Sequence, residues 1–588
     1  MRFIKVVPVA AAIVSVLIVL AIFGPIIANP QELGWLQGDE ITNQYGWHQY
    51  RADASHLFPI VTDRGSYPLP MAVANFGTIP FIDLLLKLLS PILPAKLQYL
   101  GPVFVIGVAL QAILGWAVLR EATVDGRGAA YELSLFLGAV LFGTAPVMIV
   151  RFYYMHISLA MQWPILLSLL IYLRSYRVTY WRTIRDFSAV TAISAAIMPY
   201  TMMMVLLVYG AYIIKSIFDR SLDWPKYILM AIPLQCGLAV LLASGFLEVG
   251  GLGTFPAGGF GLFSSNFFSM IDPIYANFSS QFIPDLHVVG PGQYEGFGYV
   301  GVGVLFLFLV SALVSIANRR KPTVGSAGKF WPLIAVALVS FLWAMSNVMA
   351  FGTYVIEVPL PSVLMGFLQN FRSSGRFIAV VIYLLMFISI STLILKLKPK
   401  NAALVIIISA ILQLVDLTSP FLQMHQRFSS RSQSKDWTER FTDPAYQSLG
   451  RYHDTLIILP PWQCREWHLP RPDYSPPNFI RFENLAMDEN LRTNSFYGGR
   501  LPVIQGLYHC EVFLRKLQAQ PADKRTAYIL TSRTFALYGQ HIAATHSCDF
   551  ADGMFICRGD RMMPGLSDRA RRQILLPASS PSPDKGVS

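Results

Sequence analysis

The stretch VVPVAAAIVSVLIVLAIFGPIIA at residues 6–28 decides the class of protein, because it is a long apolar run without a single charged residue. At about 1.5 Å per residue, a helix of this length crosses the hydrocarbon core of a bilayer. Arg2 and Lys5 precede it. A cleaved signal peptide has a shorter apolar region and a small-residue cleavage site, so we predict a retained membrane anchor.

The composition of the whole chain also indicates a membrane protein. Of its 588 residues, 54% are hydrophobic and only 14% are charged, and the mean hydropathy is +0.49. A soluble domain is about 25% charged. The net charge of +12 does not point to a nucleic-acid partner, because much of the Lys and Arg lies in short loops between apolar runs and no nucleic-acid motif accompanies it.

Ten further apolar runs predict membrane-spanning helices, which gives about eleven spans in all. They lie near 97–119, 133–152, 157–173, 187–200, 201–218, 227–247, 298–318, 330–351, 376–395 and 401–418. The region 157–218 could be divided differently. The segment 77–93 contains Asp83, Lys87 and prolines, so we predict that it is interfacial or re-entrant.

Basic residues predict the orientation, because short cytoplasmic loops are enriched in Lys and Arg. The basic residues cluster at every second connection: Arg120 and Arg127; Arg174, Arg177, Arg182 and Arg185; Lys215, Arg220 and Lys226; Arg319, Arg320, Lys321 and Lys329; Lys396, Lys398 and Lys400. The stretch from Tyr227 to Asn318 contains none. We therefore expect a cytoplasmic N-terminus and, after eleven spans, a C-terminal region outside.

The segments predicted to lie outside are too long to be simple turns. Three of them, 29–96, 248–297 and 352–376, belong to a predicted transmembrane domain at 1–418. Loops of this length are uncommon unless they are functional.

The polar end of the chain predicts a small α/β domain at 419–565. It contains strand-like runs at 455–460 and 553–558 and a helix-like stretch at 508–520. The Ser- and Pro-rich residues 566–588 are predicted to be disordered.

The cysteines agree with an outside location for this domain. Cys236 lies in an apolar run, and four cysteines lie in the polar last quarter of the chain. In an oxidising compartment they would form two disulfides, and proximity favours Cys464–Cys510 and Cys548–Cys557 among three pairings. The alternative is four reduced thiols. No CxxC pair or zinc-finger spacing occurs.

Adjacent carboxylates follow the first span. Asp39 and Glu40 lie in WLQGDEITNQYGWHQYR at 35–51, where they could act as a general base or hold a divalent cation. The alternative is a solvated loop beside the membrane.

Two arginines oppose the positive-inside trend. Arg372 and Arg376 lie in FRSSGRF at 371–377 on the predicted outer side. Guanidinium groups bind phosphate in a two-pronged manner, so the motif could clamp a lipid phosphate or pyrophosphate. The alternative is anchoring to headgroups by snorkelling.

Four more polar residues are candidates for the same outer face. Arg151 and His156 lie in RFYYMHISLAMQW, and Asp272 and Glu295 lie in a loop without basic residues. The acids could bind a cation or sugar hydroxyls beside the aromatic side chains. The alternatives are a hydrogen-bonded helix end for His156 and a packed glycine-rich cap for the acids.

Several stretches together resemble a bacterial family, the DUF6311 group of membrane proteins. They are GDEITNQYGW (38–47), FFSMIDP (267–273), YEGFGYVGVG (294–303), FRSSGRF (371–377) and QLVDL (413–417). An acid in a long first outer loop, many spans and an outer C-terminal domain also resemble the GT-C superfamily of glycosyltransferases that use polyprenyl-phosphate sugars.

The resemblance implies a GT-C-like fold and sugar transfer on the periplasmic face of a bacterial inner membrane. By this resemblance Asp39 would be the catalytic base or a ligand of Mg²⁺ or Mn²⁺, and Arg372 and Arg376 would hold the donor phosphate. The implied partners are membrane lipids, a polyprenyl-phosphate-linked sugar and an envelope glycan or glycolipid acceptor.

Two features depart from the GT-C pattern. A paired Asp-Asp or Glu-Asp is common in the superfamily, whereas this chain reads Asp39-Glu40, and the tail has no WWDYG-like signature, so protein N-glycosylation is not supported. The alternatives are a non-enzymatic transporter of lipid-linked glycans or an envelope assembly protein, and a pseudoenzyme whose tail covers a decayed site.

Overall fold

The computed structural model places most of the chain in two compact units. It describes residues 2–124, 126–219, 223–247, 259–273, 278–284, 286, 291–317, 327–429, 434–465, 478–499, 501–559 and 565–575. The first unit comprises Met1–Trp35, Pro94–Leu242 and Pro256–Ser432, and the second comprises Leu36–Leu93, Ala243–Phe255 and Gln433–Ser588.

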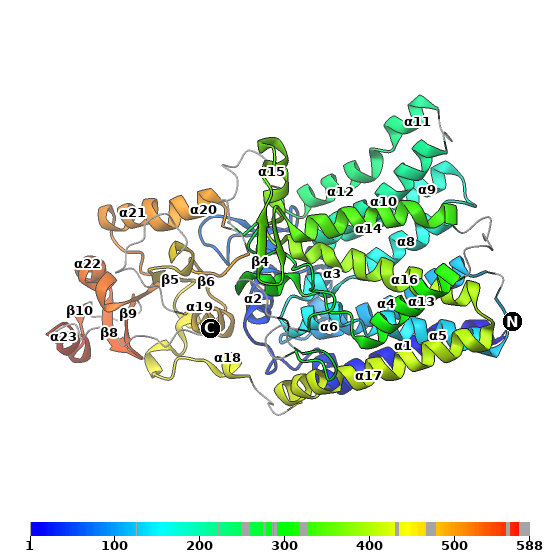
Figure 1. Cartoon of the computed structure of the whole chain (residues 1–588). Helices are drawn as coiled ribbons and strands as arrows, with labels where there is room; N and C mark the ends of the chain where they lie inside the picture. Colours follow the sequence, from blue (N-terminus) through cyan, green and yellow to red (C-terminus); the bar gives the residue numbers. More distant parts are fainter. Residues whose placement is uncertain are drawn as a thin grey trace. The chain divides into compact units, whose positions relative to one another are not determined.

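The first unit is a bundle of apolar helices (Figure 1). Its main helices are α1 (Arg2–Phe23), α4 (Leu100–Ala122), α5 (Ala129–Gly143), α6 (Pro146–Tyr153), α7 (Ile157–Ala160), α8 (Trp163–Arg174), α9 (Tyr180–Ile197), α10 (Pro199–Phe218), α11 (Trp224–Leu229), α12 (Ile232–Ala243), α13 (Val302–Ala317), α14 (Ala327–Met345), α16 (Ile378–Lys396) and α17 (Pro399–Ser429). Eight helical segments of the described chain are long and apolar enough to cross a membrane.

The predicted spans coincide in place with helices, but several of them differ in length or continuity. Among the described residues, α13 and the apolar part of α14 are shorter than a full span, and α9 includes Arg182, Arg185 and Asp186 near its start. The predicted span 133–152 is divided into α5 and α6, because Ala145 precedes Pro146 and adopts an extended conformation. The span number of about eleven is therefore approximate.

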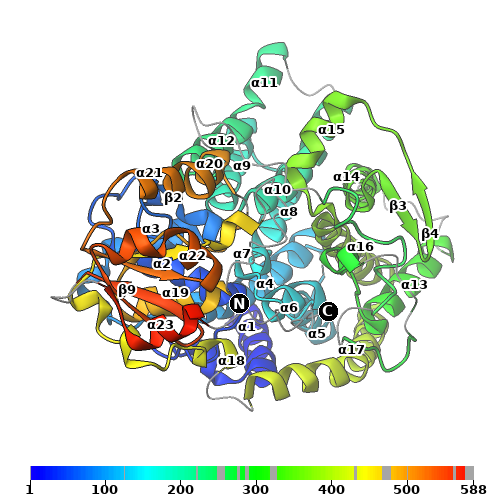
Figure 2. The same cartoon turned by 90° about the vertical axis from the view of Figure 1, so that its left-hand side faces the viewer.

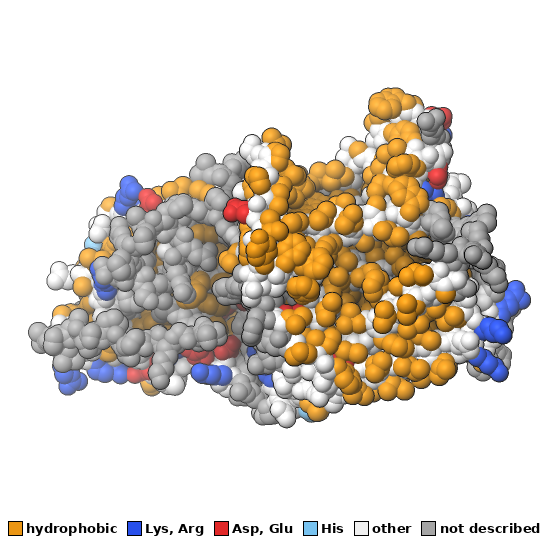
Figure 3. Space-filling model, in the orientation of Figure 1, with side chains coloured by type: hydrophobic (Ala, Val, Ile, Leu, Met, Phe, Trp, Pro, Cys, Tyr) orange, Lys and Arg blue, Asp and Glu red, His pale blue; other side chains and the backbone are white. Residues whose placement is uncertain are grey.

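The bundle has an apolar interior and an apolar exterior. Phe142, Leu169, Val205 and Phe387 lie in one buried hydrophobic cluster. Figure 3 shows hydrophobic side chains spread over the outer face of the helices as well. Because soluble monomers rarely expose apolar patches of such extent, this surface is suited to lipid, and the chain is a polytopic α-helical membrane protein.

The QLVDL motif has a structural task in this bundle. Gln413 and Asp416 on α17 accept hydrogen bonds from the backbone N–H groups of Val304 and Val302, at 3.2 and 3.0 Å. Asp416 also accepts one from the Tyr299 hydroxyl at 2.6 Å. These bonds satisfy N–H groups in the first turn of α13, which have no partner within that helix. Two of the stretches that carry the family resemblance thus pack against each other.

The second unit contains a six-stranded sheet with the strand order β10-β8-β9-β7-β5-β6. Its strands are β5 (Thr455–Leu459), β6 (Arg492–Thr493), β7 (Thr526–Leu530), β8 (Ser547–Ala551), β9 (Met554–Arg558) and β10 (Gly565–Leu566). β5 is parallel to β6 and β7, and β9 is antiparallel to β7 and β8. The predicted strands at 455–460 and 553–558 are confirmed as β5 and β9.

Helices surround this sheet (Figure 2). They include α19 (Phe479–Asp488), α20 (Val503–Leu507), α21 (Phe513–Ala519), α22 (Ser532–Ala543) and α23 (Asp568–Leu575). The helix-like stretch at 508–520 forms a π-helical turn at Tyr508–Val512 followed by α21.

The second unit also contains the first long loop, in contrast to the sequence-based domain boundary at 418. The loop forms α2 (Asp39–Ala52), β1 (Val61–Thr62), β2 (Met71–Ala72) and α3 (Pro80–Leu88). Tyr45 and Phe76 share a buried cluster with Phe496 of the C-terminal region. The Gln49 amide donates a hydrogen bond to the Leu491 carbonyl at 3.0 Å. Burial of these aromatic side chains joins residues that are more than 400 positions apart in the sequence.

α3 is amphipathic. Pro80 and Asp83 are buried, whereas Phe81, Leu85 and Leu88 are exposed. An exposed apolar face is consistent with the predicted interfacial location of 77–93. That location stays a prediction.

Two disulfides close the second unit. They join Cys464 to Cys510 and Cys548 to Cys557, the two pairs expected from proximity. Cys236 is a free cysteine.

The C-terminal tail differs in part from the predicted disorder at 566–588. Leu566 ends β10, and 568–575 form α23. Arg569 on this helix donates to Asp443 at 2.7 Å and to Asp549 at 2.5 Å, contacts that local composition does not reveal. Residues 576–588 lie outside the described chain.

Candidate functional site

The second unit places Asp39 at the start of a helix. Asp39 and Glu40 are in the first turn of α2, where the helix dipole favours negative charge. Gly38, which precedes the helix, has a positive φ of 51°, and its N–H donates to Asp436 at 2.7 Å. Asp39 is half-buried, whereas Glu40 is 1% exposed. Of the two predicted catalytic acids, Asp39 is therefore the more accessible.

A third carboxyl group lies near Asp39 and comes from the C-terminal region. Glu483 on α19 is fully buried and accepts hydrogen bonds from the Thr42 hydroxyl at 2.9 Å and from the Tyr497 N–H at 3.3 Å. Burial raises the pKa of Glu483 to about 8, and the charge of Asp39 contributes in the same direction. At neutral pH the group therefore holds a proton beside an accessible carboxylate.

The sequence analysis missed Glu483 because its partner on α2 is 441 residues away. The one local signal is its position between Phe482 and Leu485 on the buried face of FIRFENLAMD. An acid on the buried face of a helix is exceptional, since buried carboxyl groups need hydrogen-bond or ionic partners.

Glu483 makes stability depend on pH. Its pKa of about 8 in the folded chain lies above the value of 4.5 for an isolated glutamate. The contribution of its protonated form to stability is therefore complete below about pH 4 and is lost as the pH rises through 8. We expect Glu483→Gln to remove this loss. Thermal unfolding is measured at pH 6 and at pH 9. Between these two pH values, the stability of the wild type should fall by more than that of the variant. Identical pH dependence of the two would contradict a protonated Glu483.

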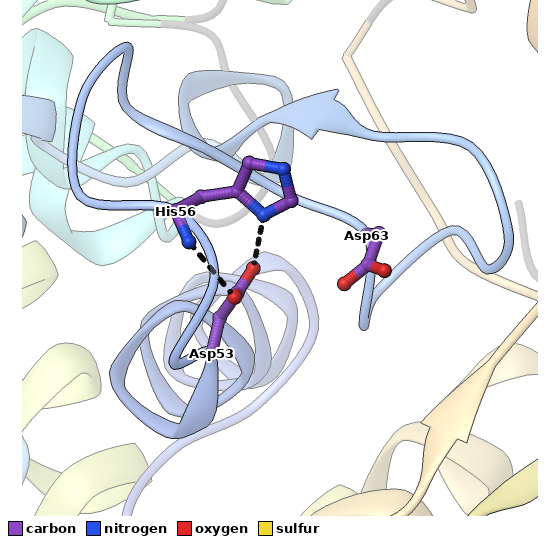
Figure 4. A group of neighbouring side chains, drawn as sticks. All are labelled: Asp53, His56 and Asp63. Atoms are coloured by element: carbon purple, nitrogen blue, oxygen red, sulfur yellow. Dashed lines mark hydrogen bonds and ion pairs between the residues drawn. The ribbon is translucent and has the colours of Figure 1, made fainter.

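A separate group in this unit offers ligands for a metal ion. Asp53, His56 and Asp63 bring ligand atoms within 4.8 Å of one another (Figure 4). Two carboxylates and an imidazole suit Mn²⁺ or Zn²⁺. Sequence reasoning placed the candidate metal ligand at Asp39 and missed this group.

The same contacts also complete the turn that ends α2. Asp53 is the C-cap residue, and its carboxylate accepts hydrogen bonds from the N–H of Ser55 at 2.7 Å and from the His56 ring at 2.9 Å. Burial would raise the pKa of Asp53, but the hydrogen bonds from His56, Ser55 and Thr62 outweigh it and hold the pKa below its usual value. The group thus has a structural role that needs no ion.

The first unit brings three predicted site residues together. Arg151 donates to the Glu295 carboxylate at 2.7 Å, and Arg376 donates to the same carboxylate through two nitrogens, at 3.0 and 2.5 Å. The side chains of Arg151, Glu295 and Arg376 are 5%, 6% and 10% exposed. They form a buried Arg–Glu–Arg triad.

The electrostatics of the triad fix its charge state. Burial would raise the pKa of Glu295, but the guanidinium groups of Arg376 and Arg151 outweigh it and hold the pKa well below its usual range. The charge of His156 acts in the same direction. Glu295 is therefore an ionised, doubly paired carboxylate rather than a proton acceptor.

FRSSGRF positions Arg376 by close backbone packing. Gly375 lies against Gly296, so that an added Cβ would be 2.5 Å from the Gly296 Cα. Only glycine allows this approach. The Ser265 hydroxyl donates to the carbonyls of Gly296 and Gly375, at 3.1 and 3.2 Å. The motif and the loop of Glu295 are thereby held together.

The other predicted residues of this unit have different surroundings. Arg372 lies 5.8 Å from the centre of the Phe263 ring, and no described carboxylate forms an ion pair with it. His156 precedes α7, and its N–H donates to the Arg151 carbonyl at 2.9 Å. Asp272 is buried in the turn after Phe268. Of the two arginines of the predicted phosphate clamp, Arg376 is therefore already bound to Glu295, and Arg372 is not.

These features define the class: a polytopic helical membrane protein with a small disulfide-bonded α/β domain. The chain belongs to the family described as a domain of unknown function (DUF6311), whose model matches residues 12–418. The model of the DUF6311 C-terminal domain matches residues 445–559. The predicted membership of this family is confirmed.

Among solved structures, the chain is similar to the oligosaccharyltransferase of Archaeoglobus fulgidus in the apo form. The two are 11% identical, the match covers 95% of this chain and 75% of the other, and the TM-score is 0.37. A score this low does not establish a shared fold. No curated protein matches the chain.

Proposed function

We propose that the protein is a GT-C-type glycosyltransferase. It transfers a sugar from a polyprenyl-phosphate donor to a cell-envelope acceptor on the periplasmic face of the bacterial inner membrane. The observation that carries the proposal is Asp39: a half-buried carboxylate in the first turn of the helix that follows the first span, with protonated Glu483 close by. The resemblance to GT-C enzymes supports an acid at this position as the catalytic base.

The proposed chemistry needs one proton acceptor. Asp39 takes the proton of the acceptor hydroxyl as its oxygen forms a bond to the anomeric carbon, and the polyprenyl phosphate leaves with the electrons of the broken bond. By the resemblance, the arginines of FRSSGRF bind the donor phosphate, and Arg372 is the one that forms no ion pair with a described carboxylate. Arg376 and Arg151 act as positioning residues, because their bonds to Glu295 hold FRSSGRF and the loop of Glu295 together.

Deletion of the gene tests the activity. In detergent-solubilised membranes, wild-type extracts should transfer the sugar from the lipid donor to the acceptor, and deletion extracts should not. Mass spectrometry of envelope glycolipids should show an acceptor that lacks one sugar. A transporter gives a different result, because detergent abolishes the need for transport and both extracts would then transfer sugar equally. That outcome would reject the glycosyltransferase.

A further inference from the structure

The loop before FRSSGRF is almost wholly apolar and nevertheless ordered. It contains the hairpin of β3 (Val348–Phe351) and β4 (Tyr354–Glu357) and the short helix α15 (Ser362–Leu368). Between 352 and 370, Glu357 is the one charged residue. No residue of β4 or α15 is buried within the structure.

The exposed side chains of this loop are large. Val363 is 86% exposed, Tyr354 68% and Phe367 49%. Hydrogen bonds at the turn of the hairpin hold it in place, because the Asn266 side chain pairs with both backbone groups of Gly352 at 2.9 and 3.0 Å. The apolar side chains are therefore displayed by a fixed element.

The apolar surface of the loop continues the outer face of a membrane helix. On α14, Ile334, Leu338 and Leu342 are exposed in one row. Near the end of that row, the Trp343 ring lies 6.0 Å from the ring of Phe367 on α15. Figure 3 shows hydrophobic side chains both on this loop and on the neighbouring outer face of the bundle, with other atoms between them.

We infer that β3, β4 and α15 are embedded in the interface of the lipid bilayer, at the end of the bundle where α14 ends and α16 begins. The occupant of this apolar surface is the phospholipid leaflet, since the row on α14 that it continues faces lipid. β3 also bridges to Asn266, whereas β4 pairs with β3 alone among the described strands. The outer edge of β4 excludes the hydrocarbon centre, where backbone groups without hydrogen-bond partners are costly. The headgroup and acyl boundary supplies water for the backbone and apolar surroundings for Val363 and Phe367. Tyr354 suits that depth.

Spin labels on the full-length protein test this placement. Cys236→Ala removes the free thiol and leaves the four disulfide-bonded cysteines. A nitroxide is then attached at Val363→Cys or at Phe367→Cys. The protein is reconstituted in vesicles of phosphatidylethanolamine and phosphatidylglycerol. The collision rates of each label with oxygen and with a water-soluble nickel chelate report lipid and water, respectively.

Two matched positions calibrate the result. Leu309 on α13 is 58% exposed and serves as the lipid control, and Leu537 on α22 is 63% exposed and serves as the water control. At 363 and 367, we expect an oxygen-to-nickel ratio several-fold above that at 537. A ratio equal to that at 537 would place the loop in water. Protection from both reagents would show a protein partner, and either result overturns the inference. A gel-filtration profile that matches the wild type, together with one label per chain, confirms that each variant is folded.

Discussion

Replacing Asp39 with asparagine should abolish sugar transfer while leaving the protein folded. General base catalysis contributes about 10²–10⁴-fold to a rate, and asparagine cannot accept the proton. Asparagine has nearly the same shape and is tolerated at a helix start, so the change in stability should stay within about 1 kcal/mol. Transfer is measured in detergent-solubilised membranes of the deletion strain that carries each variant.

Two variants control this experiment. Asp39→Glu keeps a carboxylate and should retain part of the activity. Glu511→Gln removes an acid of the same unit whose side chain is 35% exposed, and should retain all of the activity. The charge of Asp39 contributes to the raised pKa of Glu483, so Asp39→Asn should also lower that pKa and weaken the pH dependence of stability. Full transfer by Asp39→Asn would remove Asp39 from the reaction, whatever the effect on Glu483.

Replacing Glu295 with glutamine should destabilise the first unit strongly. The change leaves the like charges of Arg151 and Arg376 buried without the carboxylate that pairs with both. Removing one partner of a buried ion pair costs about 3–5 kcal/mol. Unfolding in mixed detergent micelles, followed by far-UV circular dichroism, measures the loss.

Glu132→Gln is the matched control for this change. It breaks an ion pair of the same unit, Arg120–Glu132 at 3.1 Å, whose side chains are 25% and 20% exposed. Pairs nearer to solvent contribute about 1 kcal/mol or less. If Glu295→Gln and Glu132→Gln lower the free energy of unfolding equally, the triad does not hold the loop of Glu295 to the bundle.

The helices of the bundle could be predicted because their signal is local. An apolar run must pair its backbone internally in lipid, so composition and length suffice. The division between α5 and α6 is local as well, since it follows from Pro146. α9 shows the limit of this reasoning: its charged first turns lie before the apolar run at 187–200, so the helix begins at Tyr180 and not at the start of the predicted span.

The candidate sites were predicted only in part, because their contacts are distant in sequence. Arg151 and Glu295 are 144 residues apart, and both were singled out by their charge near a membrane surface. Their pairing could not be foreseen, since charge alone does not distinguish a ligand-binding arginine from a structural one. Glu483 lies on a helix of the C-terminal region and not beside a predicted span, so its charge did not single it out. The cysteine pairs were accessible because Cys548 and Cys557 are only 9 residues apart, and their pairing leaves Cys464 and Cys510, which are 46 residues apart, as the second pair.

The two-part construction of the second unit has a consequence for biosynthesis. Tyr45 and Phe76 need Phe496 for their burial, and about 340 residues separate 36–93 from 433–588. At roughly 5–20 residues per second, the ribosome takes on the order of 20–70 s to cover that distance. During this interval the aromatic face of the first segment is open to chaperones and proteases. A fragment that begins at 433 would lack Tyr45 and Phe76 and would leave the complementary face around Phe496 exposed permanently. Biochemical work on this domain therefore requires both segments in one polypeptide.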